Sequence, residues 1–288
     1  MIDLSKLCPL ILENLGSGLI VISEERTIVY ANKKACELLK KQKEELIGRN
    51  ARSTLFPLFS ESEGSSCSYE ALLQEGKVCE FDALLNRGDG ETFFAHIFAT
   101  LIRHEGRPYV LVNFYDITPQ KELEKRLYQA AITDPLTGLY NRRFADEMLK
   151  QEKLTYKRYK TPFCILLIDL DNFKTINDVY GHDAGDKVLV AVANVLKSSV
   201  RESDIVARWG GEEFLILLRR IELEDAIKVA EKIRNAICQL KVPPVEGITA
   251  SIGVSCYSGE EDVYNLVRKA DLALYQAKAQ GKNCVILF

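Results

Sequence analysis

ARWGGEEFLILL, residues 207–218, carries two adjacent glycines and then two adjacent glutamates between two strand-like runs. Residues 204–209 are rich in strand formers, and residues 214–218 are continuously apolar. A Gly-Gly pair between such runs predicts a two-residue β-hairpin turn, because both central residues of a type I′ turn need positive φ. We therefore expect Glu212 and Glu213 at a hairpin tip. Charges there can simply keep a sheet edge soluble, so other segments must decide their role.

A second acidic stretch, LLIDLDNFKTINDVYGHDAGD at 166–186, overlaps the end of an apolar strand predicted at 162–168. Asp169 ends this strand and could meet Glu212 across neighbouring strands. These carboxylates and the backbone carbonyl of Leu170 would form the oxygen-rich site that Mg²⁺ prefers, and bound Mg²⁺ binds phosphates and can activate a hydroxyl group. Taken alone, Asp169 would be interpreted as a helix N-cap, but the other carboxylates of the pattern favour metal binding.

From residue 134 onward, strands and helices alternate along the chain. This order predicts an α+β domain whose central, mostly antiparallel sheet is covered by helices. Besides the hairpin, the predicted elements are a strand at 162–168, a helix at 186–200, a helix at 222–240, a strand at 247–257, a helix at 263–280 and a closing strand at 283–288.

Four motifs of this half resemble those of the GGDEF family: DPLTGLYNRR at 134–143, DLDNFKTINDVYGHDAGD at 169–186, GGEEF at 210–214 and ALYQAKAQGKN at 273–283. The resemblance covers 134–288 and implies a fold similar to the palm domains of cyclases and polymerases. GGDEF domains are diguanylate cyclases, which condense two GTP molecules into cyclic di-GMP. The third motif residue is Glu instead of Asp, which preserves the carboxylate.

The resemblance assigns roles to the predicted metal site. Asp169, the Leu170 carbonyl and Glu212 would bind two Mg²⁺ ions, with Mn²⁺ as an alternative. Glu212 would also act as the base that helps deprotonate the ribose 3′-hydroxyl, and Glu213 would help position that hydroxyl and the metals.

Substrate-binding roles follow from the same resemblance. Asn177 and Asp186 would recognise guanine, since a carboxylate accepts from N1–H and the 2-amino group, which adenine does not offer together. Asp186 therefore favours GTP over ATP, and His182 in the same predicted loop would line the base pocket. Phosphates would be held by Lys174, Lys278 and Lys282, the last two placed i,i+4 on one helix face. Relatives usually carry Arg where Lys282 stands, so the charge is kept but the bidentate fork is lost.

Arg201 and Asp204 form the R-x-x-D pattern that marks the inhibitory product site in this family. Arg can donate to guanine O6 and N7, while Asp accepts from the opposite edge of the base. The strand that follows would connect this pair to the catalytic hairpin. The alternative is an exposed i,i+3 ion pair that contributes little to stability.

Residues 1–118 predict a small mixed domain with two short strands, a helix that Asn32 can cap and a three-stranded antiparallel meander. The order of these elements, YAN before the first helix, ELIGRN and a terminal DIT together resemble a PAS sensor domain, an antiparallel sheet with flanking helices. Flavin-binding relatives carry an Asn-Cys-Arg motif, which is absent here. Haem-binding relatives use a helical histidine, whereas His96 and His104 fall in or near predicted strands.

The PAS ligand is therefore left unknown. His96 shares a strand face with Phe94 and Phe98, which favours a core or surface histidine over a ligand. The linker 119–133 predicts a helix with a seam of Leu123, Leu127 and Ala130, spaced 4 and 3 apart. We favour a stalk that pairs two chains into a homodimer, with a linker helix packed on its own chain as the alternative.

The whole chain excludes some classes of protein. Its net charge of -3 gives no electrostatic footprint of a nucleic-acid-binding protein. No apolar run approaches the roughly 20 residues of a membrane span, and the N-terminus lacks a signal-peptide pattern. The eight cysteines include no CxxC pair, and several lie in apolar runs such as PFCILLIDL (162–170). This usage predicts reduced, buried thiols and a cytoplasmic protein.

The resulting hypothesis is a PAS-linked diguanylate cyclase that uses GTP and Mg²⁺, works as a homodimer and is inhibited by its product. One alternative is a silent GGDEF domain that only binds cyclic di-GMP through Arg201 and Asp204. Its intact carboxylates and guanine-binding residues argue against this. Another is a cyclase acting on other nucleotides, which Asp186 disfavours.

Overall fold

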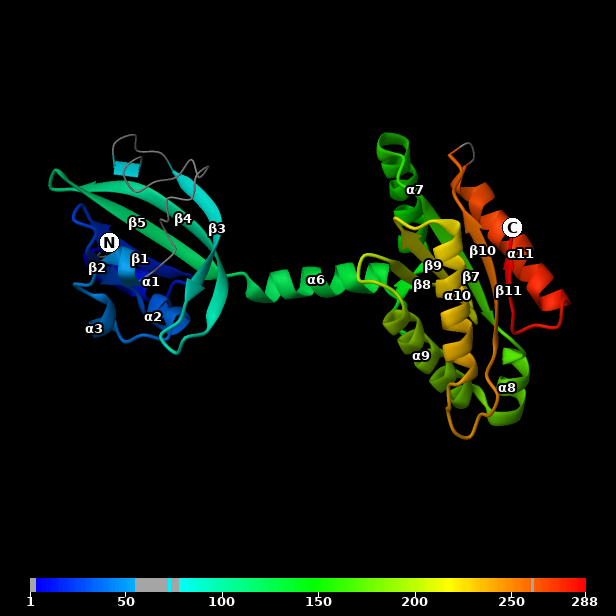
Figure 1. Ribbon diagram of the computed structural model, residues 1–288. Helices are drawn as coiled ribbons and strands as arrows, with labels where there is room; N and C mark the ends of the chain where they lie inside the picture. Colours follow the sequence, from blue (N-terminus) through cyan, green and yellow to red (C-terminus); the bar gives the residue numbers. More distant parts are fainter. Residues whose placement is uncertain (1–3, 55–71, 74–77, 260–261) are drawn as a thin grey trace. The chain divides into compact units, whose positions relative to one another are not determined.

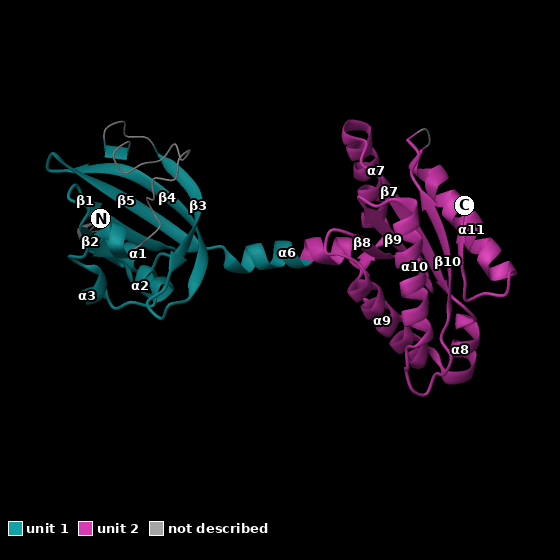
Figure 2. Cartoon of the chain, viewed as in Figure 1, with its two compact units in different colours: residues 1–126 teal, residues 127–288 magenta. Residues whose placement is uncertain are grey.

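The structure, a computed structural model, describes residues 4–54, 72–73, 78–259 and 262–288. The chain forms two compact units, residues 1–126 and 127–288, coloured teal and magenta in Figure 2. The boundary between them falls inside helix α6 (Thr118–Ile132). Within the described residues, no helix is both long and apolar enough to cross a membrane.

The first unit is built on one antiparallel sheet (Figure 1). Its strand order among the described residues is β2-β1-β5-β4-β3, and every pairing is antiparallel. The predicted meander is confirmed. The strands are β1 (Gly18–Ser23), β2 (Ile28–Ala31), β3 (Cys79–Asn86), β4 (Thr92–His104) and β5 (Arg107–Asp116), and the helices are α1 (Leu4–Glu13), α2 (Lys33–Leu39), α3 (Lys43–Leu46) and α4 (Ala51–Thr54).

Asn32 caps helix α2, as the sequence predicted, and also binds the backbone of β1 and α1. Its Oδ1 accepts from the backbone N–H of Ala35 at 2.8 Å, which caps α2, and from Leu19 of β1 at 2.9 Å. Its Nδ2 donates to the carbonyls of Leu12 and Ser17, each at 3.0 Å. One buried amide therefore joins α1, β1 and α2 with all its hydrogen-bonding groups satisfied.

His96 lies on the outer face of the sheet, where it bridges two carboxylates of β3. Its Nδ1 is 2.7 Å from Asp82 Oδ1, and its Nε2 is 2.9 Å from Glu80 Oε1. Both ring nitrogens face acceptors, so the protonated imidazolium fits best. The hydrogen bond to Asp82, helped by that to Glu80, raises the pKa of His96 above 6.5. Of the two predicted alternatives, a core or a surface histidine, the structure shows the surface one.

This arrangement predicts a pH-dependent stability. A group whose pKa is raised by folding stabilises the fold fully below its unfolded pKa, about 6.5, and loses this contribution as pH rises through its folded pKa. We expect His96→Gln to lower the unfolding free energy at about pH 5.5 and to have a smaller effect at about pH 8.5. Urea unfolding at both pH values measures this. A pH-independent difference between variant and wild type would contradict it.

Helix α6 begins at the end of β5, where Asp116 Oδ1 accepts from the backbone N–H of Thr118 at 2.8 Å. No residue of α6, all of which the structure describes, is buried. Leu123 and Leu127 of the predicted seam are 58% and 63% exposed. Neither side chain is covered within its own unit, and the dimer stalk and the packed linker helix both remain predictions.

The second unit contains a six-stranded sheet among its described residues, ordered β11-β10-β7-β9-β8-β6. The four central strands pair antiparallel, and the two edge strands pair parallel to their neighbours. The predicted mostly antiparallel sheet is confirmed. Its strands are β6 (Tyr140–Asn141), β7 (Phe163–Leu170), β8 (Ile205–Arg208), β9 (Glu213–Arg219), β10 (Ala250–Cys256) and β11 (Val285–Leu287), and its helices are α7 (Arg142–Tyr159), α8 (Phe173–Tyr180), α9 (His182–Ser199), α10 (Leu223–Cys238) and α11 (Val263–Ala279).

Strand β7 is buried on both faces, which explains its continuous apolar run. Leu166 and Ile168 point into a core shared with α9 and α10. Ile165 and Leu167 point into a second core shared with α7 and α11 (Figure 1). By the same alternation Asp169 points to the α11 side, so the strand delivers one carboxylate at its end toward that helix.

The prediction of reduced, buried thiols is wrong at five of the seven described cysteines, three of which are disulfide-bonded and two of which are exposed. Cys164 of β7 lies directly opposite Cys256 of β10 and forms a disulfide with it, because the strand register brings their Cα atoms to 3.9 Å. Cys8 and Cys238 are free but exposed. Cys79 is also disulfide-bonded, Cys36 and Cys284 are free and half-buried, and Cys67 lies outside the described residues.

Candidate active site

The hairpin that carries the two glutamates differs from the predicted turn. Strand β8 ends at Arg208 and β9 begins at Glu213, so the connection has four residues, 209–212. The backbone N–H groups of Trp209 and Gly210 both donate to the Glu213 carbonyl, at 2.8 and 3.2 Å. Neither Gly210 nor its neighbour has positive φ. The predicted type I′ turn is therefore wrong.

The two glycines differ in their surroundings. A Cβ at Gly210 would lie 2.7 Å from Oε2 of Glu213, so a side chain there would require that carboxylate to shift. A Cβ at Gly211 would meet nothing within 4 Å. The face of the loop beside Gly211 is therefore open, as a site that receives a ligand from solvent requires.

Asp169 and Glu213 are direct neighbours across the β7–β9 ladder. The next step of the ladder joins the Leu170 N–H to the Glu212 carbonyl at 3.4 Å. The predicted pairing of Asp169 with Glu212 is therefore off by one residue: Glu213 lies opposite Asp169, and Glu212 lies beside Leu170. Lys278 of α11 donates to Asp169 Oδ2 at 2.7 Å. Asp169 is no helix cap, because α8 begins after Asn172.

The charges at this strand end are not balanced. Burial raises the pKa of Asp169, Lys278 opposes this in part, and the charges of Glu212 and Asp171 add to the rise. Burial also raises the pKa of Glu213, and the charge of Asp169 raises it further. One ammonium group therefore faces several carboxylates, and ionising all of them is unfavourable without a further cation.

This donor set fits a divalent cation. Carboxylate and carbonyl oxygens are the ligands of Mg²⁺ and Mn²⁺, and the raised pKa values of Asp169 and Glu213 indicate negative charge that a cation would neutralise. Among the described residues no three His, Cys, Asp or Glu side chains form a metal-binding group. The predicted set of Asp169, Leu170 and Glu212 contains two such side chains and one carbonyl.

Asp171 has a role that the sequence pattern did not predict. Its carboxylate accepts from the hydroxyls of Ser251 and Thr249, at 2.7 and 2.8 Å, and from the backbone N–H of Asn283 at 3.0 Å. These bonds join the end of β7 to β10 and to the loop after α11. An acidic residue with three protein donors is structural, and only the tertiary fold reveals them.

The predicted placement of Lys278 and Lys282 on one helix face is wrong. Helix α11 ends at Ala279, and Gly281 and Lys282 follow with φ of +110° and +66°. A glycine in this conformation ends helices readily. Lys282 therefore lies in the loop, where its Nζ donates to Asn172 Oδ1 at 2.6 Å. This contact places the ammonium group of Lys282 against Asn172, two residues after the end of β7.

The predicted guanine-binding loop is shorter than expected. Helices α8 and α9 are separated only by Gly181, with φ of +82°. His182 and Asp186 therefore lie on the first turns of α9, and the predicted helix start at 186 is too late. Asn177 lies on α8 with Lys174, and its amide oxygen would overlap a Cβ at residue 185. The structure thus brings Asn177 next to the residue that precedes Asp186.

Arg201 and Asp204 do not form the ion pair considered as the alternative. Asp204 Oδ2 accepts from the Arg201 backbone N–H, and its Oδ1 accepts from the Arg219 N–H, both at 3.0 Å. Asp204 therefore holds the turn and joins it to β9, while Arg201 remains exposed. Two hollows, of about 420 and 320 Å³, are each lined by both residues of the pattern.

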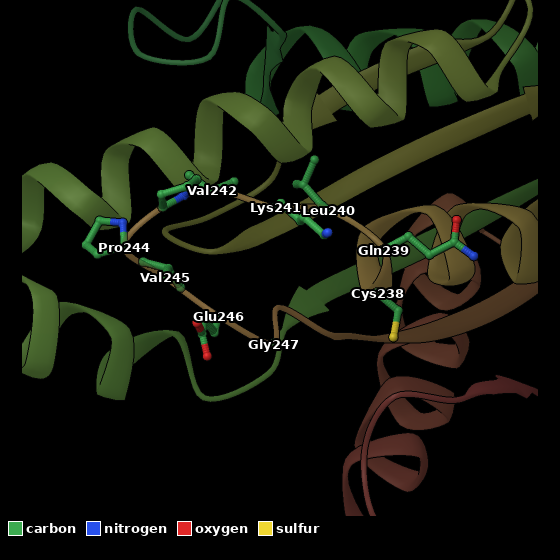
Figure 3. A pocket seen from close by; sticks show the side chains of 10 residues that line it. Cys238, Gln239, Leu240, Lys241, Val242, Pro244, Val245, Glu246 and Gly247 are labelled. Atoms are coloured by element: carbon green, nitrogen blue, oxygen red, sulfur yellow. The ribbon is translucent and has the colours of Figure 1, made fainter.

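A further hollow, of about 620 Å³, lies in the loop between α10 and β10 (Figure 3). Its lining runs from Cys238 to Gly247 and contains none of the predicted site residues. The residues labelled there are the last residue of α10, Cys238, and residues of the loop that follows it. The candidate site is therefore the strand end at Asp169, not the most spacious of these hollows.

Comparisons with known proteins agree with this geometry. A model of the family described as "Diguanylate cyclase, GGDEF domain" matches residues 131–284, and a PAS domain model matches residues 16–119. Diguanylate cyclase DgcM of Escherichia coli (strain K12) is 41% identical over 198 residues, which cover 69% of this chain and 48% of DgcM. The chain spans about half the length of this relative.

Solved structures of similar fold support the same assignment. The coiled coil and GGDEF domain of DgcB from Caulobacter crescentus, in complex with c-di-GMP, has a TM-score of 0.57 at 29% identity, covering 60% of this chain and 93% of that one. The active GGEEF domain of a diguanylate cyclase from Vibrio cholerae has a TM-score of 0.50 at 36% identity, covering 51% and 96%. This chain belongs to the GGDEF family of diguanylate cyclase domains and carries a PAS domain before it.

Proposed function

We propose that this chain condenses two GTP molecules into cyclic di-GMP and two pyrophosphates, working as a homodimer in the cytoplasm. The proposal rests on the pairing of Asp169 with Glu213 across β7 and β9, beside Glu212 and Lys278. In this proposal residues 1–118 are a PAS sensor, residues 119–133 a stalk and residues 134–288 the cyclase domain.

The chemistry is an attack of the 3′-hydroxyl of one GTP on the α-phosphorus of the other, with pyrophosphate as the leaving group. The Glu212 carboxylate would accept the hydroxyl proton, and Glu213 would orient the hydroxyl. A second attack in the opposite sense closes the ring. Because the two reacting nucleotides are equivalent and each chain offers one set of these residues, two chains must face each other.

The metal and phosphate roles remain as the sequence predicted them. Asp169, the Leu170 carbonyl and Glu212 would hold two Mg²⁺ or Mn²⁺ ions, which when bound neutralise phosphate charge and acidify the attacking hydroxyl. Lys278 would then exchange part of its interaction with Asp169 for the triphosphate. Its position at 2.7 Å from Asp169 supports a site that needs positive charge before substrate arrives. Lys174 and Lys282 would supply the remaining positive charge.

Guanine selection would come from Asn177 and Asp186, with His182 lining the pocket. Asp186 and His182 are exposed on the first turns of α9, where a ligand can reach them. An ionised carboxylate accepts two hydrogen bonds from the guanine N1–H and 2-amino group. Adenine leaves those acceptors without donors, so GTP is favoured over ATP.

One assay separates this proposal from its alternatives. The full chain is incubated with Mg²⁺ and either GTP or ATP, and the products are separated by chromatography. Cyclic di-GMP from GTP alone is expected. Tight binding of cyclic di-GMP without turnover would instead indicate a silent sensor, and a cyclic product from ATP would indicate a different cyclase.

Product feedback is the second part of the proposal. The exposed Arg201 guanidinium would bind the guanine edge of cyclic di-GMP, while Asp204 holds the turn on which it lies. We expect Arg201→Ala to keep the initial rate within about twofold, since the site lies outside the acidic cluster, and to weaken inhibition by added product by about tenfold. Initial rates across a cyclic di-GMP titration measure both. Unchanged inhibition in the variant would place the product site elsewhere.

A further inference from the structure

Arg208, the last residue of β8, binds the backbone of the hairpin loop through its guanidinium group. Its Nε and Nη2 both donate to the backbone carbonyl of Gly211, at 3.0 and 2.8 Å. Gly211 directly precedes Glu212, so this carbonyl belongs to the peptide unit that leads into the proposed base. A guanidinium that presents two N–H groups to one acceptor fixes its position more firmly than a single donor does.

The same guanidinium is anchored at its other end. Nη1 of Arg208 lies 3.2 Å from both carboxylate oxygens of Asp134, and both side chains are less than a fifth exposed. Asp134 Oδ1 also accepts from the backbone N–H and the hydroxyl of Thr137, at 2.9 and 2.7 Å. The charge of Arg208 is thus compensated, and its side chain is held in one geometry.

Asp134 comes two residues after the end of α6. The turn that follows the helix is closed by a bond from the Asp134 N–H to the Leu139 carbonyl at 2.8 Å. Asn141 Nδ2 donates to the carbonyl of Ala131, on the last turn of α6, at 2.9 Å. Any displacement of the end of α6 therefore moves the turn that holds Asp134.

A second contact joins this segment to the same loop. The guanidinium of Arg142, the first residue of α7, lies 4.5 Å from the centre of the Trp209 ring. Trp209 begins the four-residue connection that Glu212 ends. The start of the loop is therefore held by Arg142, eight residues after Asp134, and Gly211 near its end is held by Arg208, which is anchored on Asp134.

We propose that Arg208 is a positioning residue for Glu212, and that together with Asp134 it transmits the position of the end of α6 to the catalytic hairpin. This inference rests on the proposed cyclase function. It assigns to the domain a route by which a change in the stalk alters turnover without touching the metal ligands or the guanine-binding residues.

The route predicts an effect on turnover instead of on substrate affinity. Arg208 is oriented toward a backbone carbonyl, not toward the predicted nucleotide-binding side chains, so KM for GTP should change little. Misplacement of a reacting group by about 1 Å can lower a rate by about 100-fold. Loosening the Gly211 carbonyl should therefore lower kcat.

Two conservative variants test the route from its two ends. Arg208→Lys keeps the charge but cannot reach Gly211 and Asp134 together with one ammonium group. Asp134→Asn keeps an oxygen for Thr137 and turns an NH₂ group toward Arg208. In the full chain we expect each to lower kcat by about 10- to 100-fold, with KM for GTP within about twofold. The matched control, Arg143→Lys on the exposed side of α7, should leave both constants unchanged.

The double variant should lower kcat no more than the more severe single variant, because both substitutions disrupt the same set of contacts, from Asp134 through Arg208 to Gly211. Hydrogen exchange of residues 209–214 should be faster in both variants than in wild type and in the control, independently of any activity. Because hydrogen exchange does not depend on activity, it tests the route even if one variant loses activity for another reason. Additive losses, or unchanged exchange in this segment, would overturn the route.

The outcomes separate this inference from the proposed function. Wild type that makes no cyclic di-GMP would refute the function and the inference with it. Wild type that makes the product, together with an unchanged kcat in Arg208→Lys and Asp134→Asn, would refute only the inference. A raised KM at unchanged kcat would assign Arg208 to substrate binding and would likewise overturn it.

Discussion

Glu212→Gln is expected to lower the rate of cyclic di-GMP formation by about 100-fold or more. The substitution keeps the shape of the side chain but removes both the charge that a metal ion requires and the acceptor for the hydroxyl proton. Loss of one preorganised electrostatic group in a reaction centre typically has an effect of about this size. Initial rates with saturating GTP and Mg²⁺ measure it.

The same substitution should leave the fold intact or slightly stabilised. Glu212 is half-buried in the connecting loop, and its charge raises the pKa of both Asp169 and Glu213. Neutral glutamine relieves this repulsion, so the unfolding midpoint should stay within about 2 °C of wild type or rise. Glu246→Gln, an exposed change in the loop between α10 and β10 that touches none of the predicted site residues, is the matched control and should keep full activity. Turnover by Glu212→Gln close to that of wild type would refute the role assigned to Glu212.

Much of the second unit could be predicted because its signals are local. The apolar run of β7 requires burial on both faces, which only a strand between two helical layers provides. Helix α10 was predicted at 222–240 from its apolar face and spans Leu223–Cys238. Asp169 could be placed near a strand end because the run of apolar residues is broken there, and β7 ends one residue later, at Leu170.

The errors occur where tertiary contacts override local preference. The hairpin connection is determined by two N–H groups that share the Glu213 carbonyl and by Arg208 binding Gly211, neither of which a Gly-Gly pair predicts. The Cys164–Cys256 bond depends on strand register, which pattern alone does not give. Helix α1 was not predicted from the sequence, and Pro9 in its interior is a residue that argues against a helix.

The seam of α6 leads to the second large expected effect. Leu123→Glu combined with Leu127→Glu should lower specific activity at nanomolar protein by about tenfold or more, with activity recovering as protein concentration rises. A stalk that pairs two chains makes the encounter of their active sites intramolecular, at an effective concentration in the millimolar range for short tethers. Like charges across the paired helices would remove that pairing. Rates over a range of protein concentrations measure the effect.

The double leucine variant should affect the pairing of two chains and not the fold of one chain, because both leucines are exposed in the single chain, at 58% and 63%. Their replacement removes no packing within either unit, so the unfolding midpoint should hardly change. Lys125→Glu is the matched control, since at about 100° per residue it lies on the opposite side of the helix. It adds negative charge to the same segment without touching the seam, and should keep the concentration dependence of wild type.

A fragment of residues 134–288, which lacks the seam altogether, should behave like the double leucine variant and still bind GTP. The reason is that, in the proposed function, each chain contributes one acidic cluster and one set of predicted guanine-binding residues, while cyclic di-GMP requires two reciprocal attacks. Reacting atoms must approach within roughly 3–3.5 Å, so the rate depends on how often two chains meet face to face. If the double variant and the fragment both showed wild-type activity that did not depend on concentration at nanomolar protein, a single chain would suffice, and the stalk would have no part in catalysis.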